Sequence, residues 1–233
     1  MNRRKFVRTV PALAAMAGTA VNSAMENIGT TGLQIIVLPE PEREGGKTLM
    51  LSLQERKTTR EIKPGDLPIQ VISNLLWAAF GVNRKTAAFG KRGRTAPSAS
   101  NSQEIDLYLA FSEGVYVYDP LQHRLIPVVE GDLRNRSGRR VGELAPVHIF
   151  YIADTGRYDL GPDQPDPHIG EMEIQKSYYY TDTGFIAQNV YLYAASAGLA
   201  AWFHNCDKVN TVKEFKLGPD QKVLFAQSVG YPA

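Results

Sequence analysis

Residues 184–198, GFIAQNVYLYAASAG, constrain the fold of this chain more than any other stretch, because they are apolar around most of their circumference when drawn as a helix. Ile186, Val190 and Tyr193 recur at three- and four-residue spacing, and Gly198 marks the end of the helix. A helix that is apolar on nearly every side must be buried on nearly every side. We therefore predict a central helix whose small alanine and serine side chains allow close contact with neighbours, a second subunit included.

Alternating apolar residues predict strands before this helix. Residues 105–111, IDLYLAF, alternate as a half-buried strand does, and GVYVY at 114–118 follows after two residues. Asp119 and Pro120 then begin a turn before a third run at 123–129. Short connections join antiparallel neighbours, so these runs predict an antiparallel meander. Further strands are expected at residues 146–153, 200–204 and 222–229.

A second clear helix is predicted over residues 66–80. Asp66 is a candidate N-cap, apolar residues from position 69 to position 80 recur at helical spacing, and Gly81 ends the element. Residues 49–53 fit either a strand or the last turns of a helix. Short helices are expected at residues 141–144 and 208–215.

The residues 56–60, RKTTR, form the segment that we call the cationic segment. Arg56, Lys57 and Arg60 place three cations around the hydroxyls of Thr58 and Thr59. Arginine offers a planar fork of donors to phosphate oxygens, lysine a point charge and a short hydroxyl one more hydrogen bond. The segment therefore suits a phosphate, although a solvated basic helix end has the same composition.

A second polar segment, PSASNSQ at 97–103, is called the serine-rich loop. It contains almost no apolar side chain, follows a basic, glycine-containing loop predicted at residues 82–93, and leads straight into the strand predicted at 105–111. Such segments are normally solvated, but a loop held on a rigid strand is where site residues tend to lie.

Residues 154–180 are rich in Gly, Pro, Asp and Tyr and show no clear period before Met172. A long irregular segment inside a compact domain is usually a functional lid, a partner-wrapping arm or disordered. The three consecutive tyrosines at 178–180 suit stacking on a planar ligand or anchoring of a lid to the core, and we favour the anchor.

The N-terminus predicts an export signal. Basic residues at positions 3–8 precede a modestly apolar run at 10–21, and small residues suit cleavage after Ala20 or Ala24. The run is too short and too weakly apolar to span a membrane. NRRKFV at 2–7 resembles a twin-arginine signal, which implies export of the folded protein to the periplasm. We expect a signal over residues 1–24, an extended arm over 25–47 with an edge strand at 34–38, and one domain over 48–233.

The composition argues against nucleic acid, disulfides and metal sites. A net charge of +2, with no basic run interleaved with aromatics, argues against nucleic acid. The single cysteine, Cys206, excludes an internal disulfide and a cysteine-based metal cluster, and we expect it to be a small buried apolar residue. The histidines lie too far apart in sequence to form a spaced metal motif, so no metal site is predicted. They are His123, His148, His168 and His204.

In their order along the chain, these segments resemble the nitroreductase-like FMN flavoproteins, and within them the shorter azoline-dehydrogenase-like branch. The resemblance rests on RKTTR at 56–60, PSASNSQ at 97–103, TGFIAQNVYLYAASAGL at 183–199 and VGYP at 229–232. It implies a mixed α+β fold, with a mainly antiparallel sheet flanked by helices, in a homodimer with FMN at the subunit interface. The implied activity is hydride transfer through the flavin on a small organic substrate, for which no catalytic side chain is required.

The resemblance also implies how the cationic segment is used. Arg56, Lys57 and Thr58 match the positions that hold the FMN phosphate and ribityl chain. Arg60 matches a basic residue near the pyrimidine side of the flavin ring, where a cation stabilises the anionic reduced flavin.

Two further segments complete the implied flavin site. Thr183 and Gly184 match a turn whose backbone approaches the N5 edge of the flavin, and a glycine there allows close approach. The serine-rich loop matches a loop of the family whose polar atoms contact the flavin. Its matching residues are Pro97, Ser98 and Asn101, and Gln103 supports the loop.

This chain departs from the classical members of the family in two places. The stretch between Arg60 and Pro97 is shorter, and Gln103 is followed by Glu104 where those members have a proline. These departures argue against the usual nicotinamide and nitro-compound pocket. An exported enzyme has no assured NAD(P)H, so we expect either another electron carrier or an organic substrate that the flavin oxidises.

Two other classes of function stay open at this point. One is a degenerate flavin- or ligand-binding module without turnover. The other is an accessory protein that binds a peptide or partner through residues 154–180. Purified protein that is yellow and whose flavin cycles between oxidised and reduced states would favour the enzyme over both.

Overall fold

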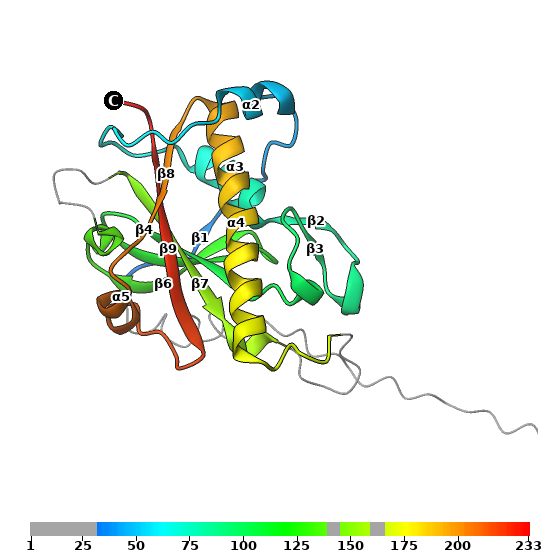
Figure 1. The fold of residues 1–233 in the computed structure, drawn as a ribbon. Coiled ribbons are helices and arrows are strands. Elements are labelled where there is room, and N and C mark those ends of the chain that lie inside the picture. Colours follow the sequence, from blue (N-terminus) through cyan, green and yellow to red (C-terminus); the bar gives the residue numbers. More distant parts are fainter. Residues whose placement is uncertain (1–31, 139–144, 159–165) are drawn as a thin grey trace, which may run out of the picture.

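The computed structural model describes residues 32–138, 145–158 and 166–233 of the chain (Figure 1). Its main element is a seven-stranded sheet in the order β1-β6-β5-β4-β7-β9-β8, in which every neighbouring pair is antiparallel. Helices flank this sheet, and a second sheet is formed by β2 and β3. The fold is therefore the mixed, mainly antiparallel α+β fold that the resemblance implies.

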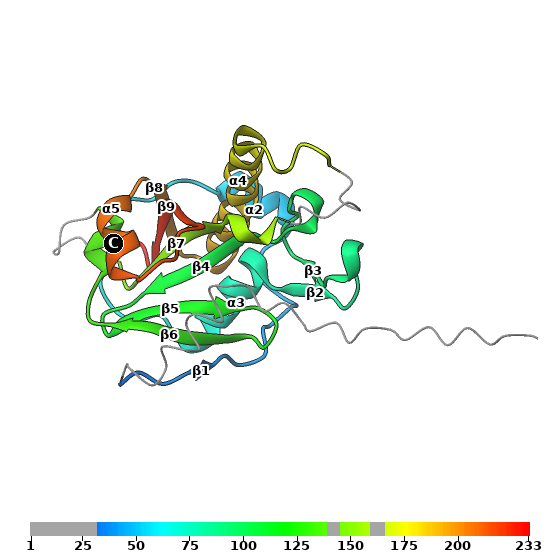
Figure 2. The ribbon, with the colours of Figure 1, turned by 90° about the horizontal axis from the view of Figure 1, so that it is seen from below.

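The predicted meander is confirmed and forms one half of the sheet (Figure 2). β4 (Ile105–Ala110) pairs with β5 (Gly114–Asp119), which pairs with β6 (Arg124–Glu130). The Phe111 N–H donates to the Gly114 carbonyl at 2.9 Å and closes the β4–β5 turn. The expected edge strand of the arm is the short β1 (Ile36–Val37), which pairs with β6.

The later strands form the other half of the sheet. β7 (Val147–Asp154) lies between β4 and β9 (Gln221–Gly230), and β8 (Ala200–His204) pairs with β9 at the opposite edge. These strands agree with the predicted ranges to within one residue at each end. β4, β5 and β7 are buried along their whole length, which places them at the centre of the molecule.

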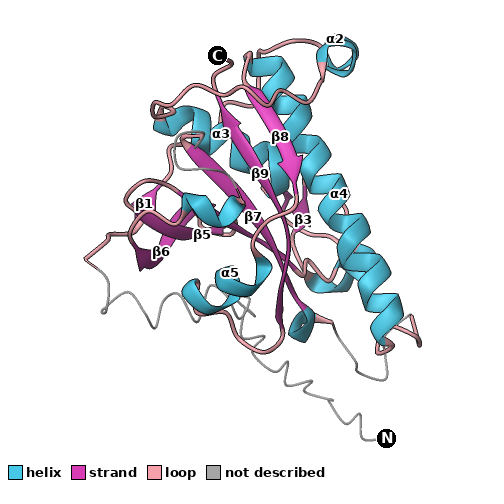
Figure 3. Cartoon of the chain, turned by 60° about the vertical axis from the view of Figure 1, so that its left-hand side comes forward, coloured by secondary structure: helices cyan, strands magenta, loops and turns pink. Residues whose placement is uncertain are grey.

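The helices cover the two faces of the sheet unequally (Figure 3). α3 (Ile69–Phe80) and α4 (Met172–Ala197) lie on one face, where they form the larger hydrophobic core with β4, β7 and β9. α5 (Lys208–Glu214) covers part of the other face. There Phe215 packs on Tyr108 and Phe150, with ring centres 6.0 and 5.0 Å away.

The helix α3 ends where predicted but begins later, with a different N-terminal cap. The Gly81 N–H donates to the Trp77 carbonyl at 2.8 Å, so the predicted end is confirmed. The N-cap residue is Pro68, and no side chain caps the helix, so the predicted Asp66 cap is wrong. The Pro68 carbonyl accepts the N–H groups of Val71 and Ile72, so the helix begins at Ile69, three residues after Asp66.

The helix α4 has 26 residues and begins well before the predicted start at residue 184. Residues 172–180 belong to it, so the expected lid over 154–180 is wrong for this part. Polar residues such as Gln175 and Lys176 are good helix formers, and the missing apolar period hid the helix from the pattern. Of the rest of that segment, residues 159–165 lie outside the described residues.

Only one face of α4 is buried within this chain. Tyr179, Ile186 and Val190 are buried at helical spacing, whereas the Phe185 side chain on the outer face is 45% exposed and Met172 is 76% exposed. The expected burial on nearly every side is therefore wrong for the single chain. A sheet can cover only the stripe of a helix that faces it, and the remaining apolar residues stay at the surface.

The remaining elements test the predictions made for short segments. Residues 49–53 lie in α2 (Leu49–Glu55), so the helical alternative is right. The loop predicted at 82–93 is wrong in part, because β2 (Val82–Arg84) pairs irregularly with β3 (Gly93–Arg94) around η2 (Ala88–Gly90). The helix predicted at 141–144 lies outside the described residues. Among the described helices, none combines the length and the apolar character needed to cross a membrane.

Candidate functional site

The cationic segment runs along the outer edge of β8. It leaves the C-terminal end of α2, and the Thr59 N–H donates to the Ala201 carbonyl of β8 at 3.0 Å. The Thr58 hydroxyl lies 3.1 Å from the hydroxyl of Tyr191 on α4. Tyr191 is itself fixed, because its oxygen accepts the Phe203 N–H at 2.8 Å. The segment is thus positioned by both a sheet edge and a helix.

The cations of this segment have aromatic rather than acidic neighbours. The Arg56 guanidinium carbon is 5.4 Å from the centre of the Tyr191 ring, and that of Arg60 is 5.2 Å from the Trp202 ring. Lys57 is exposed. Across the described parts of the chain, none of the three forms an ion pair with a carboxylate. Cations oriented on rings and left without acidic partners have the donor chemistry of an anion site.

The serine-rich loop has a strained backbone. It contains η3 (Ala99–Asn101), and Ser100, Asn101 and Gln103 have positive φ angles of 50°, 49° and 56°. Such a conformation costs a non-glycine residue about 1 kcal/mol or more and persists only where the surroundings impose it. Strain of this kind clusters at ligand-binding sites. The loop is therefore a candidate binding element by its geometry as well as by its composition.

Gln103 fixes the shape of this loop. Its Oε1 accepts from Arg94 Nε at 2.7 Å, and its Nε2 donates to the Arg92 carbonyl at 2.6 Å and to Asn101 Oδ1 at 2.8 Å. Its backbone N–H donates to Ser98 Oγ at 3.1 Å. The Gln103 side chain is buried, so these bonds are shielded from water. Pro97, at the start of the loop, is exposed.

Two arginines fix the loop by donating hydrogen bonds to Gln103. Burial lowers the pKa of Arg94 to about 10, while the guanidinium holds Gln103. Arg157, in η6 (Thr155–Arg157), donates to the Gln103 carbonyl at 2.7 Å and pairs with Asp106 and Asp154 at 2.5 and 3.3 Å. Burial raises the pKa of both aspartates, and Arg157 opposes that rise.

Thr183 and Gly184 do not form the expected turn. Both lie inside α4, and the buried Thr183 hydroxyl donates to the Tyr179 carbonyl at 2.7 Å. The Thr183 side chain is therefore engaged within the helix. Gly184 is exposed, and a Cβ atom built on it would meet nothing within 4 Å. A glycine in mid-helix with open space above it leaves the backbone accessible from outside.

The helix α4 connects the three predicted segments but does not bring them all together. Tyr191 contacts the cationic segment, and Asp182 Oδ2 accepts the N–H of Ala99 in the serine-rich loop at 2.8 Å. At about 100° and 1.5 Å per residue, Asp182 and Tyr191 lie on opposite sides of α4 and roughly 14 Å apart along its axis. Gly184 lies on the Tyr191 side, roughly 10 Å from that residue along the axis. Within one chain, the serine-rich loop therefore contacts α4 next to Thr183, on the side opposite the cationic segment.

Several residues of this arrangement were not predicted from the sequence. Tyr191 and Asp182 carry no local signal, because both lie in a helix whose polar positions look alike. Arg157 lies in a Gly- and Pro-rich stretch with no period. Arg94 begins the polar stretch that runs into the serine-rich loop, and this position was its one available signal.

Two histidines that are distant in sequence meet in space. Ser228 Oγ lies 2.8 Å from both His148 Nδ1 and His204 Nε2, because β9 runs between β7 and β8. In the described ranges, no group of three or more His, Cys, Asp or Glu side chains is placed to hold a metal ion. Cys206 is buried as expected, and burial raises the pKa of its thiol to about 11.

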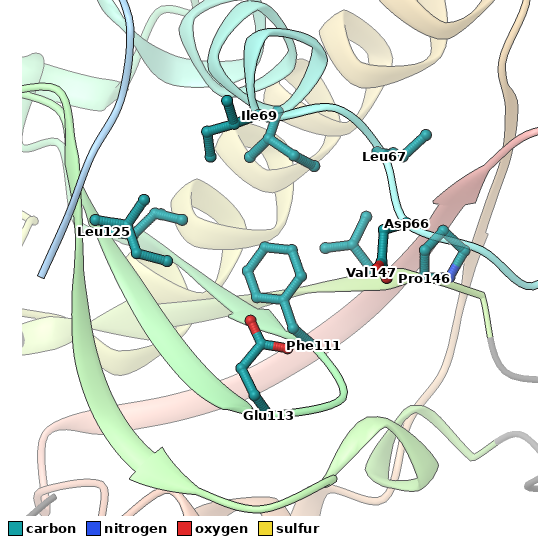
Figure 4. A pocket seen from close by; sticks show the side chains of 10 residues that line it. Asp66, Leu67, Ile69, Phe111, Glu113, Leu125, Pro146 and Val147 are labelled. Atoms are coloured by element: carbon teal, nitrogen blue, oxygen red, sulfur yellow. The ribbon is translucent and has the colours of Figure 1, made fainter. Parts of the chain in front are cut away.

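A pocket of about 160 Å³ lies apart from these segments, beside β1 and the N-terminal end of α3 (Figure 4). Leu67, Ile69 and Phe111 form much of its apolar wall, and Asp66 and Glu113 are its charged groups. The described residues that line it include none from the cationic segment or the serine-rich loop. We therefore do not assign it to the predicted site.

The fold and the donor set define a class: an α+β protein whose flanked antiparallel sheet carries, at its β8 edge, cations without a carboxylate partner in the described residues. Comparison with known families makes the class specific. The sequence model of the nitroreductase family matches residues 53–231. The chain belongs to the nitroreductase family.

Individual relatives agree with this assignment. A curated relative, "Putative nitroreductase MJ1384" of Methanocaldococcus jannaschii, is 26% identical over 183 residues, which cover 71% of this chain and 85% of that protein. The crystal structure of a "putative nitroreductase" from Ralstonia eutropha JMP134 is 35% identical, with a TM-score of 0.75, covering 87% of this chain and 91% of that chain. A third structure shares the fold at 15% identity and a TM-score of 0.51, covering 81% and 88% of the two chains. It is a "putative nitroreductase" from Desulfovibrio desulfuricans in complex with FMN.

Proposed function

We propose that this protein is an FMN-dependent oxidoreductase that transfers hydride through bound flavin to or from a small organic substrate. The observation that carries the proposal is the cationic segment, whose three cations lie at the β8 edge without a carboxylate partner in the described residues. In a solvated helix end, these side chains would have no fixed neighbours. Here two guanidinium groups rest on aromatic rings and Thr58 contacts a fixed tyrosine.

The residues present fit the phosphate end of FMN. Arg56 and Lys57 supply charge and Thr58 supplies a hydroxyl, which together are the donors that a phosphate monoester requires. Gly184 supports the ring end, since glycine in a helix interior costs roughly 1 kcal/mol relative to alanine and persists where the backbone must be approached. Thr183 would contribute its backbone alone, because its hydroxyl is bound within α4.

When bound, FMN supplies the hydride chemistry, and the chain supplies binding, orientation and electrostatics. Arg60 would place its cation beside the pyrimidine side of the ring, where it stabilises the negative charge that develops on reduction. The contact of the Arg60 guanidinium with the Trp202 ring favours the position in which it lies over that ring. No side-chain nucleophile is needed for this reaction.

We infer that the complete site is formed by two chains in a homodimer. The serine-rich loop lies on the opposite side of α4 from the cationic segment, so Pro97, Ser98 and Asn101 would serve the flavin held by the other subunit. The exposed apolar side chains of α2 support such an interface, with Leu49 63% and Met50 73% exposed.

A mixing experiment tests the shared site. One chain carries Arg56→Ala with Lys57→Ala, and the other carries Ser98→Ala with Asn101→Ala. Each variant alone has two damaged sites, whereas the mixed dimer has one intact site. We expect mixing to restore about half of the wild-type flavin capacity per mixed dimer. Absence of any restoration, with mixed dimers shown by mass spectrometry, would contradict the shared site.

More narrowly, we propose a member of the azoline-dehydrogenase-like branch that is exported by a twin-arginine signal and works in the periplasm. Because NAD(P)H is not assured there, the donor would be another electron carrier, or the flavin would oxidise an organic substrate. The shorter stretch before Pro97 and Glu104 after Gln103 support this choice. Anaerobic mixing of flavin-loaded protein with NADH and NADPH tests it, and fast bleaching of the flavin absorbance would count against it.

An absorbance spectrum of freshly purified protein is the simplest test of the main proposal. We expect yellow protein whose bound flavin can be reduced and reoxidised. Colourless protein that takes up no added FMN would instead support a degenerate binding module without turnover.

A further inference from the structure

We propose that Asp182 is a positioning residue under proton control: with Glu104 it forms a buried acid pair that shares one proton, and in that state it holds the serine-rich loop against α4. The effect on flavin rests on the proposed function, whereas the pair itself rests on contacts within the chain. Glu104 is the residue that stands where classical members of the family have a proline.

The pair and the loop meet at Ala99, the first residue of η3. Asp182 Oδ2 accepts the Ala99 N–H at 2.8 Å, and Ser102 Oγ lies 2.8 Å from the Ala99 carbonyl oxygen. The same Ser102 Oγ lies 2.5 Å from Glu104 Oε2. Asp182 is 3% exposed and Glu104 is fully buried. Both backbone polar groups of Ala99 are thus tied to the acid pair, one directly and one through Ser102.

The unsatisfied oxygen of Glu104 shows where the pair lacks a donor. The Ser102 hydroxyl lies within reach of both Glu104 Oε2 and the Ala99 carbonyl, and that carbonyl also accepts the Ser102 N–H at 2.9 Å. Glu104 Oε1 is buried, with no hydrogen-bond partner among the described residues. A proton on Asp182 directed at Oε1 supplies the missing donor and gives the pair one shared proton.

No cation replaces that proton. In the described ranges, neither Asp182 nor Glu104 forms an ion pair, and Arg157 is already engaged by Asp106 and Asp154. The other titratable groups that face Asp182 are Tyr158 and Tyr178, whose pKa values are raised and which stay neutral. Two adjacent buried carboxyl groups under these conditions hold one proton between them.

The pH dependence has a definite sign. Burial first, and the charge of Glu104 second, raise the pKa of Asp182 from its usual 3.8 to about 8. The folded protein therefore binds the proton more tightly than the unfolded chain, and the free energy of unfolding falls as pH rises between about 4 and about 8. Above that range, two facing charges repel and the Ala99 anchor is weakened. We expect FMN affinity to fall by about tenfold or more there.

The test uses variants that keep shape and remove titration. Asp182→Asn and Glu104→Gln replace each acid with a neutral group of the same size. Glu173→Gln is the matched control, because Glu173 lies on the same helix with its side chain 79% exposed. Three quantities are measured between about pH 6 and about pH 10: the FMN dissociation constant, the infrared band of a protonated carboxyl group in flavin-free protein, and the amide NMR signal of Ala99.

In wild type and in Glu173→Gln, we expect the carboxyl band to vanish and the Ala99 signal to shift with one midpoint, while FMN affinity falls. In Asp182→Asn, the signal and the affinity should stay constant. A missing band at neutral pH, or an Ala99 signal that does not move, would overturn the acid pair. A titrating pair with constant FMN affinity would overturn the positioning role. Protein that binds FMN at no pH would contradict the proposed function, and the band and the Ala99 signal would still decide on the pair.

Discussion

The cationic segment and the serine-rich loop are both polar, yet folding engages them to very different extents. In the described structure, Arg56, Lys57 and Arg60 have no carboxylate partner, and Lys57 and Arg60 are exposed. Gln103 takes part in five hydrogen bonds and is 8% exposed. Folding thus leaves the cations of the cationic segment without acidic partners in the described structure, whereas hydrogen bonds fix the serine-rich loop.

This difference separates two requirements of a binding site. Charge that is free to bind an anion has to be left unpaired by the fold. A backbone that presents polar atoms in a strained conformation has to be held by buried contacts, which stabilise the fold at the same time. Substitutions in the loop should therefore lower stability first, whereas substitutions in the cationic segment should lower binding with little effect on stability.

The largest effect is expected for Arg157→Met. The change leaves Asp106 and Asp154 as buried acids without their cation and removes the donor to the Gln103 carbonyl. Breaking a buried ion pair on one side costs about 3–5 kcal/mol, so the free energy of unfolding in urea should fall by that amount.

An arginine with more exposed partners provides the matched control for this change. Arg136, in η4 (Arg134–Ser137), also pairs with two acids, but the Asp207 and Glu214 side chains are 31% and 30% exposed. Those of Asp106 and Asp154 are 6% and 0% exposed. Arg136→Met should cost below about 1 kcal/mol. Equal losses of unfolding free energy in the two variants would show that ion pairs with buried acids contribute no more than ion pairs with exposed acids.

Gln103→Ala is expected to cost about 2–3 kcal/mol in the free energy of unfolding, because it removes three side-chain hydrogen bonds and leaves the buried Arg94 Nε without its acceptor. Gln103→Gly isolates the backbone strain, since glycine adopts the φ of 56° without steric cost. We expect the glycine variant to be more stable than the alanine variant by roughly 1 kcal/mol. The exposed Gln122→Ala is the control. A glycine variant less stable than the alanine variant would show that the loop backbone is unstrained.

Much of the scaffold could be predicted from the sequence, and local patterns explain why. The alternation at 105–111 and the spacing at 69–80 come from burial on one face of one element, which a single segment records. The start of α4 at Met172 was missed because its first turns carry no apolar stripe. The hairpin of β2 and β3 was missed because its strands are short, polar and irregularly paired.

The site was predicted less completely, because its contacts join residues that are distant in sequence. The residue types of the cationic segment indicated an anion, but its contact with Tyr191 depends on how α4 crosses the sheet. The turn expected at Thr183 and Gly184 was wrong because a glycine can lie inside a helix when tertiary packing stabilises it. Asp182, Arg157 and Glu104 became meaningful only when the fold placed them around the loop.

The cationic segment should give the opposite result to the loop. Arg56→Ala and Lys57→Ala each remove a charged phosphate donor, and such hydrogen bonds contribute about 1.5–3 kcal/mol, which is roughly 10- to 100-fold in FMN affinity. Neither side chain has an ion-pair partner in the described residues, so stability in the absence of flavin should change by less than about 1 kcal/mol, with the Arg56–Tyr191 ring contact as the larger loss. Lys85→Ala, at an exposed basic position of the β2–β3 hairpin, is the control for net charge. Unchanged FMN affinity in both variants would contradict the proposal that this segment binds the FMN phosphate.

The smallest effect, and the sharpest separation of stability from binding, is expected for Gly184→Ala. The added methyl group meets nothing within 4 Å in the flavin-free chain, so better helix propensity should raise the free energy of unfolding by roughly 0.5–1 kcal/mol. If the flavin ring approaches this backbone, the same methyl group intrudes on it, and FMN affinity should fall. Ser177→Ala, at an exposed position of α4, should stabilise the helix without that loss. A Gly184→Ala variant that is more stable and binds FMN as well as wild type would mean that the glycine serves no ligand.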